Sequence, residues 1–268
     1  MTARILVTGG TGTLGRLVVP RLRDAGREVR VLSRRVQRAD DDVEYVTGDL
    51  LTGEGIDAAV AGAPVIVHCA GGRTGDDEAT RNLVSAASRA GAEHLVYISV
   101  VGADRIPVTS GLDRAMFGYF ASKRATEQVV TGAGLPWTTL RAAQFYDLLL
   151  MAARQLARLP VLPAPAGLRF QPVDAAEVAA QLAGLALGPP AGLVPDIAGP
   201  RVYSMAGLLR GYLRARHQHR VLAPVWIPGQ AAAAIRAGAA LAPEAAVGSR
   251  TWEDFLAERA FLPERAAA

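Results

Sequence analysis

Thr8-Gly9-Gly10-Thr11-Gly12-Thr13-Leu14-Gly15 is the stretch of sequence that decides the fold. It directly follows the short apolar run Ile5–Thr8, and a segment of helical period begins after it. Glycine at this spacing permits a tight turn, lets backbone N–H groups approach a diphosphate, and allows a helix to pack closely on a strand. We therefore predict a phosphate-binding loop, with an ordinary structural turn as the alternative. Its candidate residues are Gly9, Gly10, Thr11, Gly12, Thr13, Leu14 and Gly15.

Similar apolar runs recur after this loop and alternate with longer segments of helical period. Such alternation is typical of parallel strands joined by crossover helices. Each run is apolar throughout, which indicates strands covered on both faces. The sequence therefore predicts an α/β fold with a doubly wound parallel sheet, of the Rossmann type. The expected strands are residues 5–8, 29–32, 43–46, 65–69, 95–99 and 138–141, and two expected helices are residues 77–90 and about 116–130.

The domain organisation follows from length and from a change in composition. A chain of 268 residues, half of them hydrophobic and 20% charged, is long enough for one large folded unit. After about Pro160 prolines cluster and the helical segments become alanine-rich. We expect residues 1–160 to form the nucleotide-binding core. Residues 161–268 should form a small C-terminal subdomain on the substrate side, packed on the core as one structural unit.

Charge and hydropathy exclude several classes of protein. The net charge is +4, but the basic residues are scattered, so no nucleic-acid-binding face is expected. The alanine-rich stretch 231–241 contains Arg236 and is too short to cross a membrane. The first strand begins too close to Met1 for an export signal, and a cytoplasmic location is expected. No His, Cys and carboxylate grouping has metal-site spacing, so no metal is expected. The sequence does not indicate the oligomeric state.

The second expected strand ends in Ser33-Arg34-Arg35 and carries no Asp or Glu there. A carboxylate at this place would bind the ribose hydroxyls of NAD, whereas guanidinium groups pair with a 2′-phosphate. Ser33, Arg34 and Arg35 therefore favour NADP(H) as the cofactor and a small molecule as the partner. Two solvated surface arginines are the alternative.

Further candidate cofactor contacts follow the third and fourth expected strands. Asp49, beside Leu50, is placed to accept a hydrogen bond from an adenine amino group, although it could equally cap its own turn. Cys69, Ala70 and Gly71 end the fourth strand region. Cys69 is the only cysteine, which excludes an internal disulfide, and a small buried apolar side chain is its alternative role.

Lys123 is the only lysine among the 29 basic residues, and it follows Tyr119 by four positions. On a helix these two positions share a face, so the phenol and the ammonium can point into one cleft. A nearby cation is expected to lower the pKa of the tyrosine and make it a proton donor or acceptor at neutral pH. A surface helix with an aromatic and a basic neighbour is the alternative.

With these motifs, the chain resembles a short-chain dehydrogenase/reductase. It is most similar to the atypical group that includes NmrA-like proteins and NAD(P)-binding sugar-nucleotide epimerases. The resemblance covers roughly residues 3 to 200. Its strongest segments are T-G-G-T-G-T-L-G at 8–15, E-A-T-R-N-L-V-S-A-A-S-R-A-G at 78–91, L-V-Y-I-S at 95–99 and Y-F-A-S-K-R-A-T-E at 119–127.

The resemblance implies roles for individual residues. Tyr119 and Lys123 match the catalytic Tyr and Lys of active members, and Ser99 matches the serine, although that position can fall later, where Val100 and Val101 stand. Asp76 replaces the Asn. The segment after the sixth expected strand corresponds to the substrate side in relatives. It offers Gln144 and Tyr146 as pocket residues, with simple packing as the alternative.

Together these features predict an NADP(H)-dependent oxidoreductase of the short-chain dehydrogenase/reductase type. Hydride would move to or from a small, fairly hydrophobic carbonyl or alcohol, because the C-terminal part is apolar and includes Trp226. The alternative is a non-catalytic, NADP(H)-binding, NmrA-like regulator that senses redox state. The Asp76 replacement and the valines at 100 and 101 favour this alternative, and the single lysine favours the enzyme.

Overall fold

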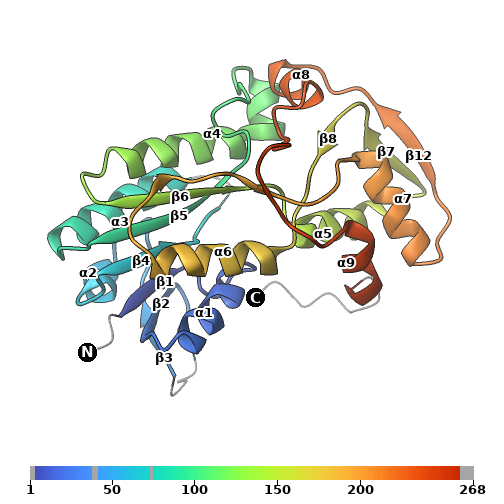
Figure 1. Ribbon diagram of the computed structural model, residues 1–268. Helices are drawn as coiled ribbons and strands as arrows, with labels where there is room; N and C mark the ends of the chain where they lie inside the picture. The colour runs from blue at the N-terminus through green and yellow to red at the C-terminus, as the bar shows by residue number, and fades with distance from the viewer. Residues whose placement is uncertain (1–3, 38–41, 73–74, 260–268) are drawn as a thin grey trace.

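A parallel sheet runs through the centre of the molecule (Figure 1). The computed structural model describes residues 4–37, 42–72 and 75–259. The strand order is β13-β10-β6-β5-β4-β1-β2-β3, with β9 paired to β6, and this confirms the predicted α/β doubly wound fold. The strands are β1 Ile5–Thr8, β2 Val29–Ser33, β3 Val43–Thr47, β4 Val65–His68, β5 His94–Val100, β6 Trp137–Ala142, β9 Gly192–Leu193, β10 Ile197–Ala198 and β13 Ala246–Val247.

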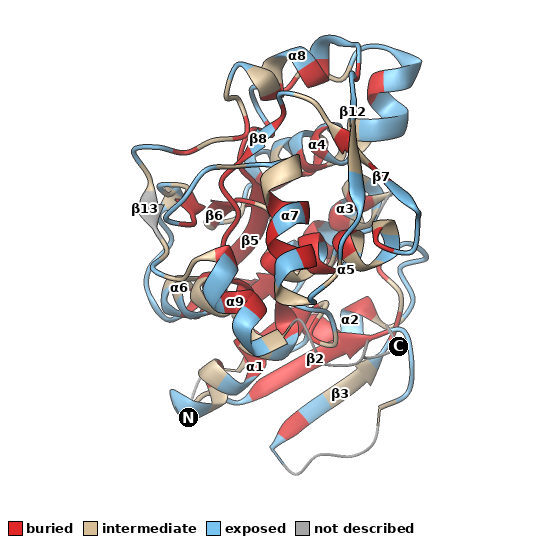
Figure 2. Cartoon of the chain, turned by 90° about the vertical axis from the view of Figure 1, so that its right-hand side faces the viewer, coloured by how far each residue is buried: buried red, intermediate tan, exposed pale blue. Residues whose placement is uncertain are grey.

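The inner strands are buried on both faces because helices cover each side. In β1, Ile5 and Val7 pack toward one layer, while Leu6 packs toward the other. Figure 2 shows the central strands buried and the outward faces of the helices exposed. The layer on one face is α1 (Gly15–Asp24) and α6 (Ala175–Leu187), and that on the other is α2 (Ile56–Val60), α3 (Asp76–Arg89) and α4 (Gly111–Thr131).

The predicted strands are confirmed within one or two residues, whereas α4 begins five residues earlier than predicted. The cause is a capping box at its first turn. The Asp113 backbone N–H donates to Ser110 Oγ at 3.0 Å, and the Ser110 N–H donates to the Asp113 carboxylate at 3.1 Å. This pair satisfies backbone donors at the helix start, so the helix extends over a segment with little hydrophobic periodicity.

The C-terminal region folds partly onto the sheet and partly beside it. The helices α5 (Tyr146–Leu156), α7 (Met205–Ala215) and α9 (Trp252–Arg259) share a separate apolar cluster built around Trp252. Two small sheets join β7 (Val161–Pro165) to β12 (Val221–Val225) and β8 (Arg169–Phe170) to β11 (Tyr203–Ser204). The short helix α8 (Gln230–Arg236) packs on α4.

The expected boundary at residue 160 does not follow the sheet. Helix α6 packs against α1, and β9, β10 and β13 all belong to the central sheet, although all four elements follow residue 160. The core therefore needs residues from the second half of the chain. The physical reason is that β6 would otherwise be an uncovered edge strand.

Candidate functional site

The glycine loop connects β1 to α1 as the sequence predicts. Gly9 has a φ of 69°, and its carbonyl accepts from the Gly12 N–H at 2.9 Å. A Cβ on Gly15 would lie 2.2 Å from the Gly9 oxygen, and a Cβ on Gly10 would lie 2.7 Å from a Val31 methyl. Side chains cannot fit at these positions, so the loop presses close to β2 and to the first turn of α1. The loop exposes Gly12 and Thr13, half-buries Thr11 and buries Leu14.

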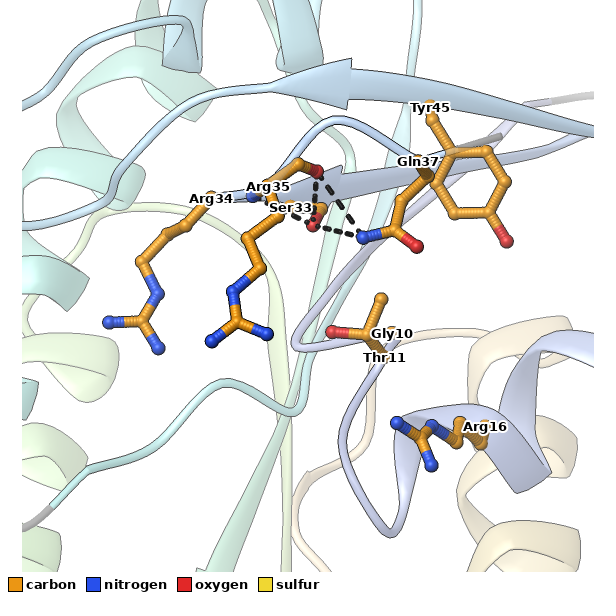
Figure 3. A pocket seen from close by; sticks show the side chains of 8 residues that line it. All are labelled: Gly10, Thr11, Arg16, Ser33, Arg34, Arg35, Gln37 and Tyr45. Atoms are coloured by element: carbon orange, nitrogen blue, oxygen red, sulfur yellow. Dashed lines mark hydrogen bonds between the residues drawn. The ribbon is translucent and has the colours of Figure 1, made fainter. Parts of the chain in front are cut away.

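A basic pocket of about 530 Å³ lies beside the glycine loop (Figure 3). Arg34 and Arg35 extend into it from the end of β2, and Arg16 approaches from the first turn of α1. None of these three guanidinium groups has a carboxylate within 4 Å in the part of the chain that the structure describes. The remaining lining residues are Gly10, Thr11, Ser33, Gln37 and Tyr45.

Hydrogen bonds hold the end of β2 in shape at this pocket. The Ser33 hydroxyl accepts from the Arg35 N–H at 3.2 Å and from Gln37 Nε2 at 3.2 Å. It also donates to the Arg35 carbonyl at 2.9 Å. The turn therefore fixes the backbone from which both arginines project. Sequence reasoning missed Arg16, although its place directly after Gly15 is a usable signal.

Asp49 lies in the turn after β3, where its carboxylate has a local partner. Its Oδ1 accepts from the Leu51 N–H at 2.9 Å, so the turn-capping alternative is present in the structure. Leu50 is buried, and its carbonyl accepts from Asn82 Nδ2 at 2.8 Å. These bonds fix the turn, and no contact tests the expected role of Asp49 toward adenine.

The segment Cys69 to Gly71 joins the glycine loop to the tyrosine and lysine. A Cβ on Gly9 would lie 2.6 Å from the Ala70 nitrogen, and one on Gly71 would lie 3.2 Å from Lys123 Nζ. Burial raises the pKa of the Cys69 thiol to about 12, so this side chain stays uncharged. These contacts make the glycine loop and Lys123 parts of one continuous site.

Lys123 is a buried cation on α4. Its Nζ donates to the Ile98 carbonyl at 3.3 Å and lies 3.9 Å from Asp76 Oδ2. Burial lowers the pKa of Lys123, and the carboxylate of Asp76 opposes that shift. Asp76 is buried too, and its other oxygen accepts from the Gly72 N–H at 2.6 Å. Burial raises the pKa of Asp76, and the ammonium group opposes it. The two buried charges therefore hold each other in place.

Tyr119 lies one turn before Lys123, as predicted, with Lys123 Nζ 5.7 Å from the centre of its ring. The expected lowering of its pKa is wrong. Although 46% of Tyr119 is exposed, loss of hydration around it and the negative charge of Asp76 raise its pKa to about 12. The reason is geometric, because the ammonium lies over the ring face and is engaged by the Ile98 carbonyl and the Asp76 carboxylate. Tyr119 is consequently a neutral phenol at neutral pH.

Ser99 is buried near the end of β5, and its hydroxyl has no hydrogen-bond partner among the described residues. It shares a face of the strand with Tyr97, whose ring lies 5.0 Å from Lys123 Nζ. An unpaired buried hydroxyl is costly unless a partner arrives. Val100 and Val101, the later positions at which the family serine can fall, are both buried.

Gln144 and Tyr146 follow β6 and differ in their hydrogen bonding and packing. Both amide atoms of Gln144 are buried and unpaired among the described residues, which leaves a donor and an acceptor open at the carboxyl edge. Tyr146 is fully buried, donates its hydroxyl to the Arg250 carbonyl at 2.8 Å and packs against both Trp252 and Phe255. The expected pocket position of Tyr146 is therefore wrong, because its ring forms the core beneath α9.

Within residues 4–37, 42–72 and 75–259, no group of three or more His, Cys, Asp or Glu side chains could hold a metal ion. In the same part of the chain, no helix combines the length and the apolar character that a membrane span requires.

A glycine loop at the first strand-to-helix junction of a doubly wound parallel sheet, next to an arginine-lined pocket, defines a dinucleotide-binding protein of the Rossmann type. The particular family follows from the sequence itself. Residues 9–183 match the model of the NAD(P)H-binding family, and the chain belongs to that family.

Curated relatives include two reductases. The chain is 34% identical over 144 residues to (4-alkanoyl-5-oxo-2,5-dihydrofuran-3-yl)methyl phosphate reductase of Streptomyces griseus, with 53% of this chain and 48% of the relative covered. It is 35% identical over 209 residues to ceramide reductase of Caulobacter vibrioides, with 71% of this chain and 63% of the relative covered. The chain thus spans about half of the first relative and less than two thirds of the second.

Solved structures share the fold over nearly the whole chain. An NADPH-dependent quinone oxidoreductase from Escherichia coli, complexed with NADPH, has a TM-score of 0.77 at 17% identity, with 95% of this chain and 99% of the other covered. A short-chain dehydrogenase/reductase superfamily protein from Agrobacterium tumefaciens, with bound NAD, has a TM-score of 0.72 at 21% identity, with 96% of each chain covered. At these identities the likeness shows the fold alone, and the neighbours were solved with either cofactor.

Proposed function

We propose that the protein is an NADP(H)-dependent oxidoreductase that acts on a small, fairly hydrophobic carbonyl or alcohol. One observation carries this proposal. Tyr119 and the buried Lys123 lie on one face of α4, and Gly71 connects Lys123 to the glycine loop at the carboxyl edge of the sheet. Reductases among the relatives add support.

The residues of the edge fit a nicotinamide dinucleotide. Glycines that leave no space for a Cβ expose backbone N–H groups at the start of α1, which suits a diphosphate. Among the described residues, buried polar atoms without a hydrogen-bond partner then follow toward β6, on Asp76, Ser99 and Gln144. A polar ligand would satisfy these atoms, which otherwise lose hydration without compensation.

We further propose that the cofactor is NADP(H) in preference to NAD(H). Arg16, Arg34 and Arg35 all line the pocket beside the loop, and their guanidinium groups have no carboxylate partner in the described chain. Guanidinium groups pair strongly with a phosphate. A carboxylate at the end of β2 would repel the 2′-phosphate of NADP(H), and this chain has Ser33 there instead.

Each side chain of the site has its own role in the proposed reaction. When bound, the nicotinamide cofactor supplies hydride exchange with carbon. The Tyr119 hydroxyl donates a proton to the carbonyl oxygen during reduction, since it is neutral at working pH. The Lys123 ammonium lies over the face of the Tyr119 ring and is itself held by Asp76 and the Ile98 carbonyl. Ser99 and Gln144 offer hydrogen bonds to the substrate oxygen or the cofactor amide.

The cofactor assignment is tested by calorimetry with NADPH and NADH. Changing Arg34 and Arg35 to Ala is expected to weaken NADPH binding by about 10- to 100-fold, because charge-assisted hydrogen bonds to the phosphate are lost, and to leave NADH binding unchanged. The same change at exposed Arg210 on α7 is the control. Equal affinities of the unaltered protein for both nucleotides contradict the assignment.

The activity is tested with NADPH and a panel of aldehydes, ketones and quinones, followed by NADPH absorbance. Tyr119→Phe removes only the hydroxyl and is expected to lower turnover by about 100-fold or more while NADPH affinity is retained. Unchanged turnover in this variant would exclude Tyr119 as the proton donor.

A second candidate function is an NADP(H)-binding redox sensor without turnover. Two observations favour it: apolar Val101 is buried at a position where relatives can place the serine, and Asp76 replaces the family Asn. Saturable NADPH binding with no turnover of any panel compound supports this alternative. We place the protein in the cytoplasm in both cases, with a small molecule and not a nucleic acid as its partner.

A further inference from the structure

One face of α4 runs through the site and beyond it. Leu112, Met116, Tyr119, Lys123, Thr126 and Val130 follow one another at alternating steps of four and three, which places them in one stripe along the helix. The stripe contains both Tyr119 and Lys123, so it lies on the face of α4 that carries the site residues.

The two halves of this stripe differ in burial. Lys123, Thr126 and Val130 are buried against the sheet and α3. Leu112, Met116 and Tyr119 are 44%, 49% and 46% exposed, although they lie on the same face. The stripe therefore changes from buried to half-exposed at Tyr119, and its half-exposed part continues from Tyr119 toward the start of α4.

Among the described residues, neighbouring elements cover this part of the stripe only in part. Phe120, about a quarter turn away, packs into the apolar cluster shared with α8. The start of α8 is bonded to Asp113, likewise about a quarter turn from the stripe, through the Ala231 N–H at 3.2 Å. Helix α8 thus lies beside the stripe, and Leu112 and Met116 remain exposed apolar side chains in line with Tyr119.

We propose that Leu112 and Met116 bind the aliphatic chain of the substrate, whose carbonyl lies at Tyr119. The inference rests on the proposed function, and it makes the substrate a medium-chain acyl compound. Seven residues of helix span about 10 Å, which matches an extended chain of roughly eight carbons. An apolar substrate chain that covers these side chains is expected to bind more tightly, since burial of each methylene contributes about 0.8 kcal/mol.

A second copy of the chain is the competing occupant of this face. Two exposed apolar side chains fall far short of the roughly 800 Å² that each partner buries in a stable interface. A partner seated there would also close the face that carries Tyr119. The substrate is therefore the occupant that this geometry favours.

The test measures binding of 2-butanone, 2-hexanone, 2-octanone and 2-decanone. Each ketone is titrated by ligand-observed NMR into protein in the presence of NADP⁺, where no hydride can be donated to the ketone. Affinity is expected to rise by about two- to fourfold per added methylene up to roughly eight carbons. Leu112→Asn and Met116→Gln should each flatten this rise, whereas Leu193→Asn on the exposed strand β9 should leave it unchanged.

Turnover and binding are read separately, so the two proposals can fail separately. Chain-length-dependent binding that both variants weaken, without turnover on any ketone, supports the inference and contradicts the proposed enzyme. Turnover without any dependence of affinity on chain length overturns the inference. So does a dependence in both variants that equals that of the unaltered protein. A fall in molecular mass by light scattering in Leu112→Asn or Met116→Gln also overturns it, because the stripe would then be an interface between copies.

Discussion

Lys123 is the residue on which the chemistry of the site depends. Its identity as the single lysine could be read from the sequence, and so could its helical spacing from Tyr119. Its surroundings could not, because the Ile98 carbonyl and Asp76 reach it only through the packing of β5 and α3 against α4. The expected effect on Tyr119 was wrong for the same reason. A spacing of four residues brings two side chains together but does not set which atoms meet.

The pH dependence of carbonyl reduction follows from the state of Tyr119. A proton donor works below its pKa, and the pKa of Tyr119 is raised to about 12. With saturating NADPH, kcat/KM for reduction is therefore expected to stay level from about pH 7 to about pH 9.5. Stopped-flow or steady-state rates on the best panel substrate provide the measurement. A tenfold fall per pH unit that begins near pH 8 would mean that the phenol ionises far earlier, and Tyr119→Phe is the control for that assignment.

At the scale of elements, the junction between β1 and α1 was the most predictable part of the molecule. Gly15 is required by a contact within this short segment, since its Cβ would lie 2.2 Å from the Gly9 oxygen. Local requirements of this kind are visible in sequence. The start of α4 was less predictable, because the Ser110 and Asp113 capping box has no hydrophobic period.

A pair of glycine substitutions separates close packing from helix propensity. Gly15→Ala places a methyl group against the Gly9 oxygen and is expected to cost about 2 kcal/mol or more and to abolish NADPH binding. Gly184→Ala, within α6 and open to solvent on the side of its Cβ, is expected to stabilise the protein by about 0.5–1 kcal/mol. Chemical unfolding and calorimetry measure the two effects. Equal stabilities would show that the loop can rearrange.

At the scale of the whole molecule, the C-terminal half both completes the sheet and builds its own core. The segment just before α9 is joined to the start of α6 by the ion pair of Arg250 and Asp174 at 2.6 Å, and to α5 by the Tyr146 hydroxyl, which donates to the Arg250 carbonyl. Asp174 also caps α6, so one residue contacts both the helix layer of the sheet and the segment that leads into the apolar cluster around Trp252. A domain boundary read from composition missed this, because proline content reports local conformation and not which strand pairs with which.

Trp252 is the central side chain of that second cluster, and its removal tests the coupling. It is fully buried, stacks 5.7 Å from Phe255, and donates from Nε1 to the Leu208 carbonyl at 3.1 Å. Trp252→Ala is expected to cost about 3–5 kcal/mol of unfolding free energy. Trp226→Ala is the matched control, since Trp226 is exposed and contacts Arg236 from 3.9 Å, and about 0.5–1 kcal/mol is expected there. Urea unfolding in which both variants lose the same amount would contradict the assigned core.

The sequence by itself determined the parallel sheet, the glycine loop, the pair Arg34 and Arg35, and the shared face of Tyr119 and Lys123. All of these follow from periodicity or from contacts within a few residues. Only the tertiary structure decided that Asp76 holds Lys123 and that Tyr146 belongs to the core. Each of these depends on side chains meeting across separate elements, and that proximity is set by how the layers pack rather than by any local spacing along the chain.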